Sequence, residues 1–395
     1  VLDSQLVYIM SSLQLLPGFV KKIDSKRRSF LWSGKDSCAG AKCLVAWDKV
    51  CLDRNVGGLG VTDLMTRNTC LLLKLLHRLF TAVGSSWASW ARGRVCLATL
   101  TGDLSGNHWM TLRALLPLYR AITTCSIKDG RSTAFWFDAW HGEDDLSTKF
   151  PSLFSHAKNP EVSVRDVLEA GLAAHLVPRL TSQAVAERDA LQLVLDDVLL
   201  SEAPDVRHYP IAGAGGNLHT GSLYRVMRCG EGMRSAEAVF VWRNQAPPRV
   251  RFFGWLVNNG RIQCRVNLAR KQIVQDTMCE VCGRAPEDTA HIFLHCGFAS
   301  SFWGALGITI ASDCSNVLLS LLRPSAIPAK HYNMFILLCC WQLWKRRNAV
   351  VFRGERSPLA ATMLLCRSEA GFWRSRLRHE DHQIVAAWCR VLHVT

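Results

Sequence analysis

The stretch from Cys279 to Cys296 limits what this chain can fold into more than any other. It contains three cysteines and a histidine with the spacing Cys279-x2-Cys282-x8-His291-x4-Cys296. Zinc(II) takes four such sulfur and nitrogen ligands in a tetrahedron, and two cysteines separated by two residues can direct both sulfurs at one ion from a single turn. Gly283 suits that turn, because glycine adopts a positive φ at little cost. The spacing therefore predicts one structural Zn²⁺ site with these four ligands.

Two other interpretations of the cysteines remain open. Cys279 and Cys282 could be a redox pair, although such pairs are expected at the strand-to-helix turn of a βαβ unit, and none is predicted before them. The four residues could also be ordinary core side chains, since free cysteine is often buried. His295 follows His291 by four residues and could replace a ligand, but Cys296 is the softer donor.

The chain is strongly basic. It has 47 Lys and Arg against 32 Asp and Glu, a net charge of +15 and a pI near 9.3. This excess indicates a polyanionic partner, and RNA or DNA is the first candidate. A single basic run is more often only a solvated helix face. The residues expected to contact nucleic acid are Arg261, Arg265, Arg270, Lys271, Lys345, Arg346 and Arg347.

Apolar periodicity predicts a mainly α protein with small β elements, an α+β fold class. Helices are expected at residues 64–80, 184–200, 249–257, 261–271 and 331–352. Asp129-Gly130 favours a type I′ turn, so residues 125–137 are predicted to form a β-hairpin. Pro286, Glu287 and Asp288 are expected in a solvent-facing connection.

Two acidic pairs resemble catalytic sites without meeting the requirements of one. Asp196 and Asp197 follow Val194-Leu195, but the helical period places both on the solvent side of a helix, whereas polymerase chemistry needs carboxylates at a tight strand turn. Asp129 is explained by its turn, and Asp138 is a single carboxylate among aromatic residues. Neither pair is therefore expected to be catalytic.

Beyond the four ligands, the chain carries a set of motifs that resembles the zinc-binding domain of plant reverse transcriptases from LINE-type (non-LTR) retrotransposons. Those motifs are Val239-Phe240-Val241-Trp242, Pro247-Pro248-Arg249-Val250, Phe252-Phe253-Gly254-Trp255-Leu256, the four ligands and Phe302-Trp303. Flanking segments are also similar to regions beside that domain, among them Phe30-Leu31-Trp32, Gly57-Gly58-Leu59-Gly60, Lys128-Asp129-Gly130 and Trp344-Lys345-x-Arg347-Asn348.

The resemblance implies an arrangement of four regions. Residues 1–100 would be thumb-like and post-thumb helices, 101–210 a connecting domain with the β-hairpin, 217–310 the zinc-binding domain, and 311–395 a basic helical region. The glycine-rich stretch 212–216 is the clearest predicted boundary. The parent polyprotein would be an RNA-directed DNA polymerase.

The expected function is binding rather than catalysis. The sequence has no Tyr/Phe-x-Asp-Asp turn of a polymerase palm and no His-Asp endonuclease set. We therefore expect a non-catalytic, zinc-dependent fragment that binds RNA or DNA with little sequence preference, and no small-molecule substrate. The alternative is a zinc-folded scaffold that binds protein and not nucleic acid. A zinc hydrolase is a weaker hypothesis, because four protein ligands leave no position for water.

The termini and the apolar segments give no signal for export or membrane insertion. Residues 1–10 lack the basic start and apolar core of a signal peptide, so the sixteen cysteines are expected to be reduced. The most apolar run, residues 334–343, is too short to cross a bilayer and predicts a buried helix instead. We expect an intracellular protein, nuclear or cytoplasmic, with no membrane partner. A first residue of Val1 suggests a fragment.

Overall fold

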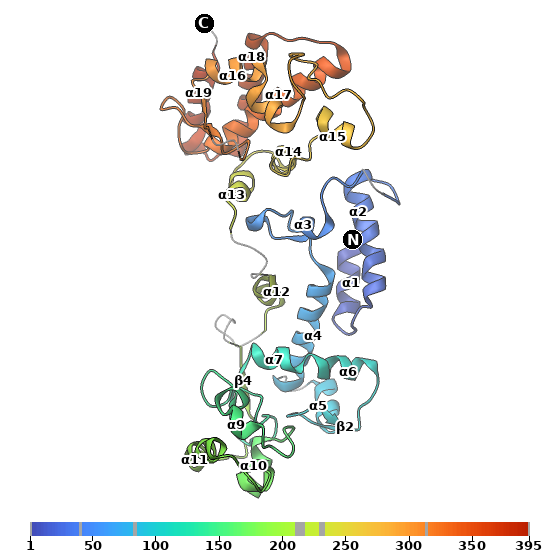
Figure 1. Cartoon of the computed structure of the whole chain (residues 1–395), viewed down its shortest axis with the longest axis vertical. Coiled ribbons are helices and arrows are strands. Elements are labelled where there is room, and N and C mark those ends of the chain that lie inside the picture. Colours follow the sequence, from blue (N-terminus) through green and yellow to red (C-terminus); the bar gives the residue numbers. More distant parts are fainter. Residues whose placement is uncertain are drawn as a thin grey trace. The chain divides into compact units, whose positions relative to one another are not determined.

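The chain divides into two compact units. A computed structural model describes residues 2–38, 42–81, 85–209, 218–228, 234–312 and 315–393. Unit 1 comprises Val1–Ile23 and Asp63–Gly230, and unit 2 comprises Asp24–Thr62 and Glu231–Thr395. Helices predominate in the described residues, with three two-stranded antiparallel pairs (Figure 1). The predicted class, mainly α with small β elements, is confirmed. The division into four regions stays a prediction, and its boundary at 212–216 lies outside the described residues.

Unit 1 contains most of the short helices and two of the strand pairs. Its helices are α1 (Leu2–Met10), α4 (Leu64–Thr81), α5 (Ser86–Arg92), α6 (Asn107–Ala114), α7 (Leu116–Ala121), α8 (Leu146–Lys149), α9 (Pro151–Phe154), α10 (Val164–Ala170), η3 (Leu172–His175), α11 (Ser182–Asp196) and α12 (Thr220–Arg228). Its strands are β1 (Val95–Cys96), β2 (Thr101–Gly102), β3 (Thr124–Ser126) and β4 (Val206–His208). Helix α2 (Pro17–Ser33) spans the boundary between the units.

Unit 2 contains the longest helix and one strand pair. Its helices are α3 (Trp47–Cys51), η2 (Arg54–Val56), α13 (Ala236–Trp242), α14 (Pro248–Asn258), α15 (Arg265–Arg270), η5 (His291–His295), α16 (Gly297–Ala305), α17 (Tyr332–Arg353), α18 (Leu359–Trp373), η6 (Arg374–Arg376), η7 (His379–Asp381) and α19 (His382–Val391). Strand β5 (Thr309–Ile310) pairs with β6 (Leu321–Leu322).

Helix α4 organises unit 1, as its predicted apolar stripe requires. Leu72, Leu73 and Leu76 are buried in a core shared with α5, α6, α7 and α12. A second core forms where α1 and the start of α2 meet α4. There the buried Asn68 accepts a hydrogen bond from the Leu15 amide at 2.7 Å and donates to carbonyl oxygens of the turn before it. This satisfied side chain fixes the turn between α1 and α2.

The predicted β-hairpin at residues 125–137 is wrong. Strand β3 begins it as expected, but its partner is the distant β4. The loop between Lys128 and Thr133 has no return strand because its donors are taken by Asp205, which accepts the amides of Lys128 and Gly130 at 2.7 and 2.9 Å and the Thr133 hydroxyl at 2.7 Å. A carboxylate far along the chain thus replaces the local pairing that Asp-Gly favours.

Of the acidic residues that resemble catalytic pairs, Asp196 and Asp197 face solvent as predicted, whereas the buried ion pair of Asp138 was not predicted. Asp196 and Asp197 are exposed at the end of α11. Asp138 is buried and forms an ion pair with the equally buried Arg207, with nitrogen-to-oxygen distances of 2.5 and 2.8 Å. Asp138 therefore neutralises a core guanidinium.

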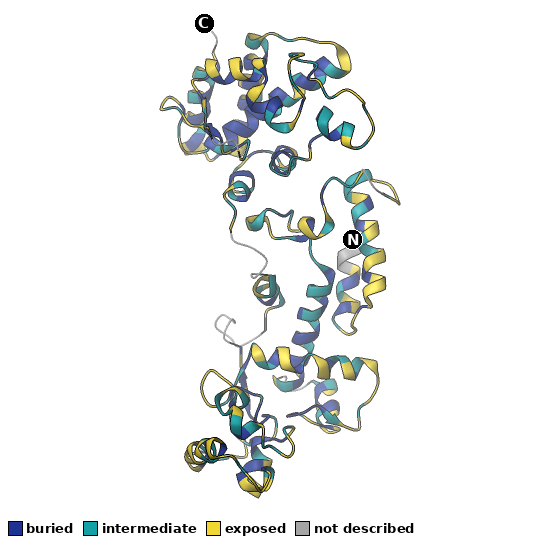
Figure 2. Ribbon diagram, in the orientation of Figure 1, coloured by how far each residue is buried: buried dark blue, intermediate teal, exposed yellow. Residues whose placement is uncertain are grey.

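Helix α17 passes through the core of unit 2 and confirms the buried helix predicted from the apolar run. Its residues 334–340 are fully buried (Figure 2). Helix α14 packs so closely on it that a Cβ at Gly254 would lie 2.6 Å from a methyl group of Leu337. The N-terminal segment of unit 2 joins this core, because the Trp255 indole donates to the Gly57 carbonyl at 2.7 Å. Within the described residues, none of the helices combines the length and apolar character needed to span a bilayer.

The pKa of Asp205 makes the stability of its loop depend on pH. Burial alone would raise this pKa, but the hydrogen bonds from Lys128, Thr133, Gly130 and Ser132 lower it overall. A lowered folded-state pKa means that the stabilisation is complete above the unfolded value of about 3.9 and is lost as the pH falls through the folded value.

We expect Asp205→Asn to destabilise unit 1 by about 2–3 kcal/mol at pH 7, because an amide has one acceptor oxygen for at least four donors. Urea unfolding with hydrogen exchange of residues 128–133 measures the loss. Asp129→Asn is the matched control on the same loop, since its carboxylate accepts the neighbouring Arg131 amide from a more exposed position. Equal effects of the two substitutions would contradict this role of Asp205.

Candidate metal centre

The four predicted ligands converge. The sulfurs of Cys279, Cys282 and Cys296 and a ring nitrogen of His291 all lie within 4.8 Å of one another. The Cys282 sulfur is 3.3 Å from Nε2 of His291. A tetrahedral zinc ion with Zn–S bonds of about 2.3 Å holds its ligand atoms about 3.8 Å apart. The four side chains thus fit a single metal ion after a contraction of about 1 Å or less.

The first two ligands lie on a tight turn. The Gly283 amide donates to the Cys279 carbonyl at 2.7 Å, and Gly283 has φ +65°, as predicted. The backbone amides of Val281 and Cys282 also donate to the Cys279 sulfur. An antiparallel bridge between Met278 and Pro286 closes the loop. The turn therefore presents the sulfur and supplies donors that favour its thiolate form.

The other two ligands lie at the ends of a π-helical turn, η5. A π-helix bonds residue i to residue i+5, which is the separation of His291 and Cys296. The Cys296 amide donates to the His291 carbonyl at 2.7 Å. Asp288 accepts the His291 amide at 2.7 Å, and the Trp303 indole donates to the Phe293 carbonyl at 2.6 Å. The unusual turn thus brings the imidazole and the third thiol to the same side.

The thiols are suited to a divalent cation. A hydrogen bond from Cys279 to Cys296, together with burial, raises the pKa of the Cys279 thiol to about 12. The same bond lowers the pKa of Cys296. The hydrogen bond between the two thiols thus favours ionisation of Cys296 over Cys279, whereas a bound Zn²⁺ stabilises each thiolate. His295 is exposed and is not among the converging groups of the described residues.

Glu287 is the residue that sequence analysis placed incorrectly. It was expected in a solvent-facing connection, but it is fully buried beside the ligand loop. Arg347 of α17 donates to both of its oxygens, with the Nε–Oε2 distance at 3.0 Å. The Arg265 amide at the start of α15 also donates to Glu287 at 3.0 Å. One carboxylate therefore joins the ligand loop to α15 and α17, and no local sequence pattern signals it.

The predicted basic run on α17 does not form one surface. Successive helical residues point about 100° apart, so Lys345, Arg346 and Arg347 face different surroundings. Lys345 is exposed but lies 3.3 Å from Glu369. The Arg346 guanidinium stacks over the Phe298 ring at 3.4 Å. Arg347 is only 4% exposed and is held by its buried partner Glu287, so it is not available for the nucleic-acid contact that was predicted for it.

The predicted basic residues near α15 are likewise of two kinds, some paired with carboxylates and some exposed without such a partner. Arg265 is paired with Glu280 and lies 3.3 Å from Asp276. Arg261 and Arg270 are exposed, and no carboxylate among the described residues lies within ion-pair distance of either. Partial burial and then the neighbouring Arg261 lower the pKa of Lys271.

Arg284, which sequence analysis did not select, is exposed on the turn that carries the first two ligands. Its position in the sequence, between the second and third metal ligands, was the signal that could have identified it as a candidate nucleic-acid contact.

Comparison with known proteins agrees with this geometry. Residues 219–303 match the family described as zinc-binding in reverse transcriptase. The resemblance drawn from the motifs is confirmed. Over 325 residues, 77% of this chain, the sequence is 26% identical to the Arabidopsis thaliana protein named "Putative ribonuclease H protein At1g65750". The match covers 50% of that relative, so the chain spans about half of its length.

A second relative from the same plant is named "Uncharacterized mitochondrial protein AtMg00310". It is 29% identical over 142 residues, which are 34% of this chain and 90% of the relative. The names of these two relatives do not mention zinc, so the metal-binding assignment depends on the family match and the four converging ligands.

Arg347→Met is expected to lower the free energy of unfolding of unit 2 by about 3–5 kcal/mol, because it leaves the Glu287 charge buried without its partner. Arg353→Met on the same helix is the control, since Arg353 pairs with Glu355 at the surface and its loss should leave the free energy of unfolding nearly unchanged. Denaturant unfolding, followed by hydrogen exchange in α15 and α17, measures both. Similar values for the two variants would rule out the role given to this pair.

Proposed function

We propose that unit 2 is a zinc-organised module that binds the phosphate backbone of RNA or DNA without catalysing a reaction on it. Cys279, Cys282, His291 and Cys296 would hold the ion. With four protein ligands the tetrahedral shell is complete, so zinc would supply a structural cross-link and not an activated water. Metal binding in small modules of this kind contributes on the order of 10–16 kcal/mol to folding.

The observation that carries the proposal is a set of exposed cations without carboxylate partners between residues 261 and 284, the segment that leads into the turn of the first two ligands. Arg261, Arg270 and Arg284 are exposed and have no carboxylate partner among the described residues. Partial burial lowers the pKa of Lys271, and repulsion from the nearby Arg261 lowers it further. Keeping like charges together costs free energy, and a polyanion offsets that cost.

The distribution of charge along the chain supports the same function. Residues 234–395 contain 21 Lys and Arg but 10 Asp and Glu, which is most of the net charge of +15. Arg265 and Arg347 have internal partners, which removes two of the predicted contacts from this surface. We expect the remaining exposed side chains to contact phosphates and not base edges. Binding should therefore show little sequence preference.

The longer relative suggests how such a module would be used. That protein is named as a ribonuclease H protein. We propose that the region shared with this chain holds nucleic acid, and that hydrolysis belongs to other parts of such a protein. The alternative, a zinc-folded scaffold for protein partners, is favoured only by the internal pairing of Arg265, Lys345 and Arg347, and the binding experiment below separates the two.

Cys282→Ser is expected to reduce bound zinc from one ion per chain to less than about a tenth after dialysis, because loss of a thiolate opens the shell. Inductively coupled plasma mass spectrometry on the purified full chain gives the ratio. Cys389→Ser is the control, since Cys389 is also partly buried but lies outside the cluster, and it should retain the ion. Full zinc content in the first variant would contradict the ligand assignment.

Replacing Arg261, Arg270 and Lys271 together by Gln is expected to weaken binding of a labelled 20-nucleotide RNA or DNA about tenfold or more at 0.1 M salt. The slope of log K against log salt should fall by about 2–3, which corresponds to three lost phosphate contacts. Fluorescence anisotropy at several salt concentrations measures both quantities.

The matched control removes the same charge from Arg323, Arg367 and Arg390, which are exposed elsewhere in unit 2. Equal losses in the two triple variants would indicate a nonspecific charge effect. No measurable binding by the unmodified, zinc-loaded chain would favour the scaffold alternative.

A further inference from the structure

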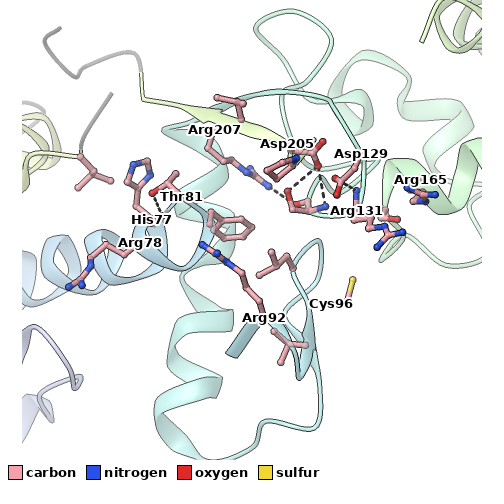
Figure 3. Close-up of a pocket in the computed structure, with 18 of the residues that line it drawn as sticks. His77, Arg78, Thr81, Arg92, Cys96, Asp129, Arg131, Arg165, Asp205 and Arg207 are labelled. Carbon is pink, nitrogen blue, oxygen red and sulfur yellow. Dashed lines mark hydrogen bonds between the residues drawn. The ribbon is translucent and has the colours of Figure 1, made fainter. Parts of the chain in front are cut away.

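Unit 1 contains a large cavity that is separate from the metal centre. Its volume is about 1330 Å³, and its walls come from α4, the segment around β1, the loop 129–132, the start of α10 and strand β4 (Figure 3). Pockets for single small molecules are usually about 300–1000 Å³. A small metabolite would fill only part of this space, so the size favours a segment of a longer molecule.

The walls carry more cations than carboxylates. The basic lining residues are Lys74, Arg78, Arg92, Arg131, Arg165 and Arg207, together with His77 and His219. The acidic lining residues are Asp129, Asp166, Glu169 and Asp205. The total is therefore positive, and the charge available to a ligand depends on which of these groups already have partners.

Each of the four carboxylates has a partner in the fold, and Asp129 accepts the Arg131 amide at 3.0 Å. Asp205 accepts backbone and hydroxyl donors from the loop 128–133. Asp166 forms a capping box with Ser163 at the start of α10, with an oxygen-to-oxygen distance of 2.7 Å. Glu169 lies 2.6 Å from Arg165. Glu169 is therefore paired with a cation, whereas Asp166 and Asp205 are held by uncharged donors and keep their negative charge. With six Lys and Arg against four Asp and Glu, the walls are left with a small net positive charge.

Three of the cations have no carboxylate partner. Lys74, Arg78 and Arg131 are exposed, and none has an acidic group within ion-pair distance among the described residues. Lys74 and Arg78 are one turn apart on α4, so their side chains are neighbours on one helix face. Arg131 lies on the other side of the cavity, with Arg92 drawn between it and Arg78 (Figure 3). The unneutralised charge is thus spread across the cavity instead of gathered at one point.

The lining offers charge but no free aromatic platform. Phe80 is the aromatic side chain among the described lining residues, apart from the two histidines. It is already stacked on Tyr119 at 5.2 Å and covered by the Arg207 guanidinium at 4.5 Å. Stacking of bases therefore has no ready surface here, and contact with phosphates is the interaction that the walls can provide.

We propose that this cavity binds a nucleic-acid strand through its phosphate backbone, as a second contact in unit 1. The distributed cations match a polyanion whose charges repeat along its length, and a single phosphate would reach only one wall. This site uses none of the residues of the metal module. It can therefore exist or fail independently of the function proposed for unit 2.

Cys96 gives a direct test, because it is the exposed cysteine of the described chain and it lines the cavity. We expect a 12-nucleotide single strand to slow alkylation of Cys96 by N-ethylmaleimide several-fold in the full zinc-loaded chain, as measured by mass spectrometry of the Cys96 peptide. Inorganic phosphate at the same phosphate concentration should give no protection. Protection by phosphate alone, or by a poly-glutamate peptide and not by the oligonucleotide, would overturn the proposal.

A charge variant tests the same site through affinity. Replacing Lys74, Arg78 and Arg131 by Gln should abolish the protection of Cys96 and reduce the salt slope by about 2–3. The control removes the same charge from Lys158, Arg179 and Arg188, which lie on unit 1 outside the cavity, and should leave both unchanged. Thermal unfolding confirms that each variant is folded.

Repeating the protection assay on the Cys282→Ser chain separates this site from the metal module. Protection that persists when the zinc centre is lost supports an independent site in unit 1. Protection that is unaffected by the Lys74, Arg78 and Arg131 substitutions in the folded variant would contradict the proposal.

Discussion

Unit 2 depends on a geometric constraint: three sulfurs and one imidazole from a short stretch of chain must meet at one point. A tight turn with a positive φ at Gly283 provides two of them, and a π-helical turn provides His291 and Cys296 five residues apart. Neither conformation is common in an ordinary helix or strand. A bound cation offsets the repulsion among the thiolates, so the two turns and the metal-ligand bonds support each other.

The buried ion pair of Glu287 and Arg347 extends this local constraint to the rest of the unit. It connects the ligand loop to α17, the helix around which the core of unit 2 is built. Two charges removed from water contribute little net stability, but either one alone in the core is costly, so the pair specifies a single arrangement of loop and helix. It also explains why the basic sequence at 345–347 is divided between the interior and the surface.

The sequence predicted the features that depend on local pattern. The apolar stripe of α4, the buried run of α17, the four ligands and Gly283 were all recognisable, because helix periodicity and ligand spacing are properties of short windows. The predictions of a hairpin at 125–137 and of an exposed Glu287 were wrong for a common reason. Asp205 lies 75 residues from Gly130, and Arg347 lies 60 residues from Glu287, and in each case a distant charged group overrode the local preference. The large cavity of unit 1 was not predictable either, since its walls come from segments spread over more than a hundred residues.

Zinc K-edge X-ray absorption on the purified full chain tests the central claim most directly, because it reports the identity and distance of the atoms around the ion. The account predicts three sulfur ligands at about 2.3 Å and one nitrogen at about 2.0–2.1 Å. Two sulfurs with two nitrogens would mean that His295 has replaced a cysteine. An oxygen ligand, or no bound zinc in a chain that is nevertheless folded, would contradict the role of the metal in holding unit 2 together.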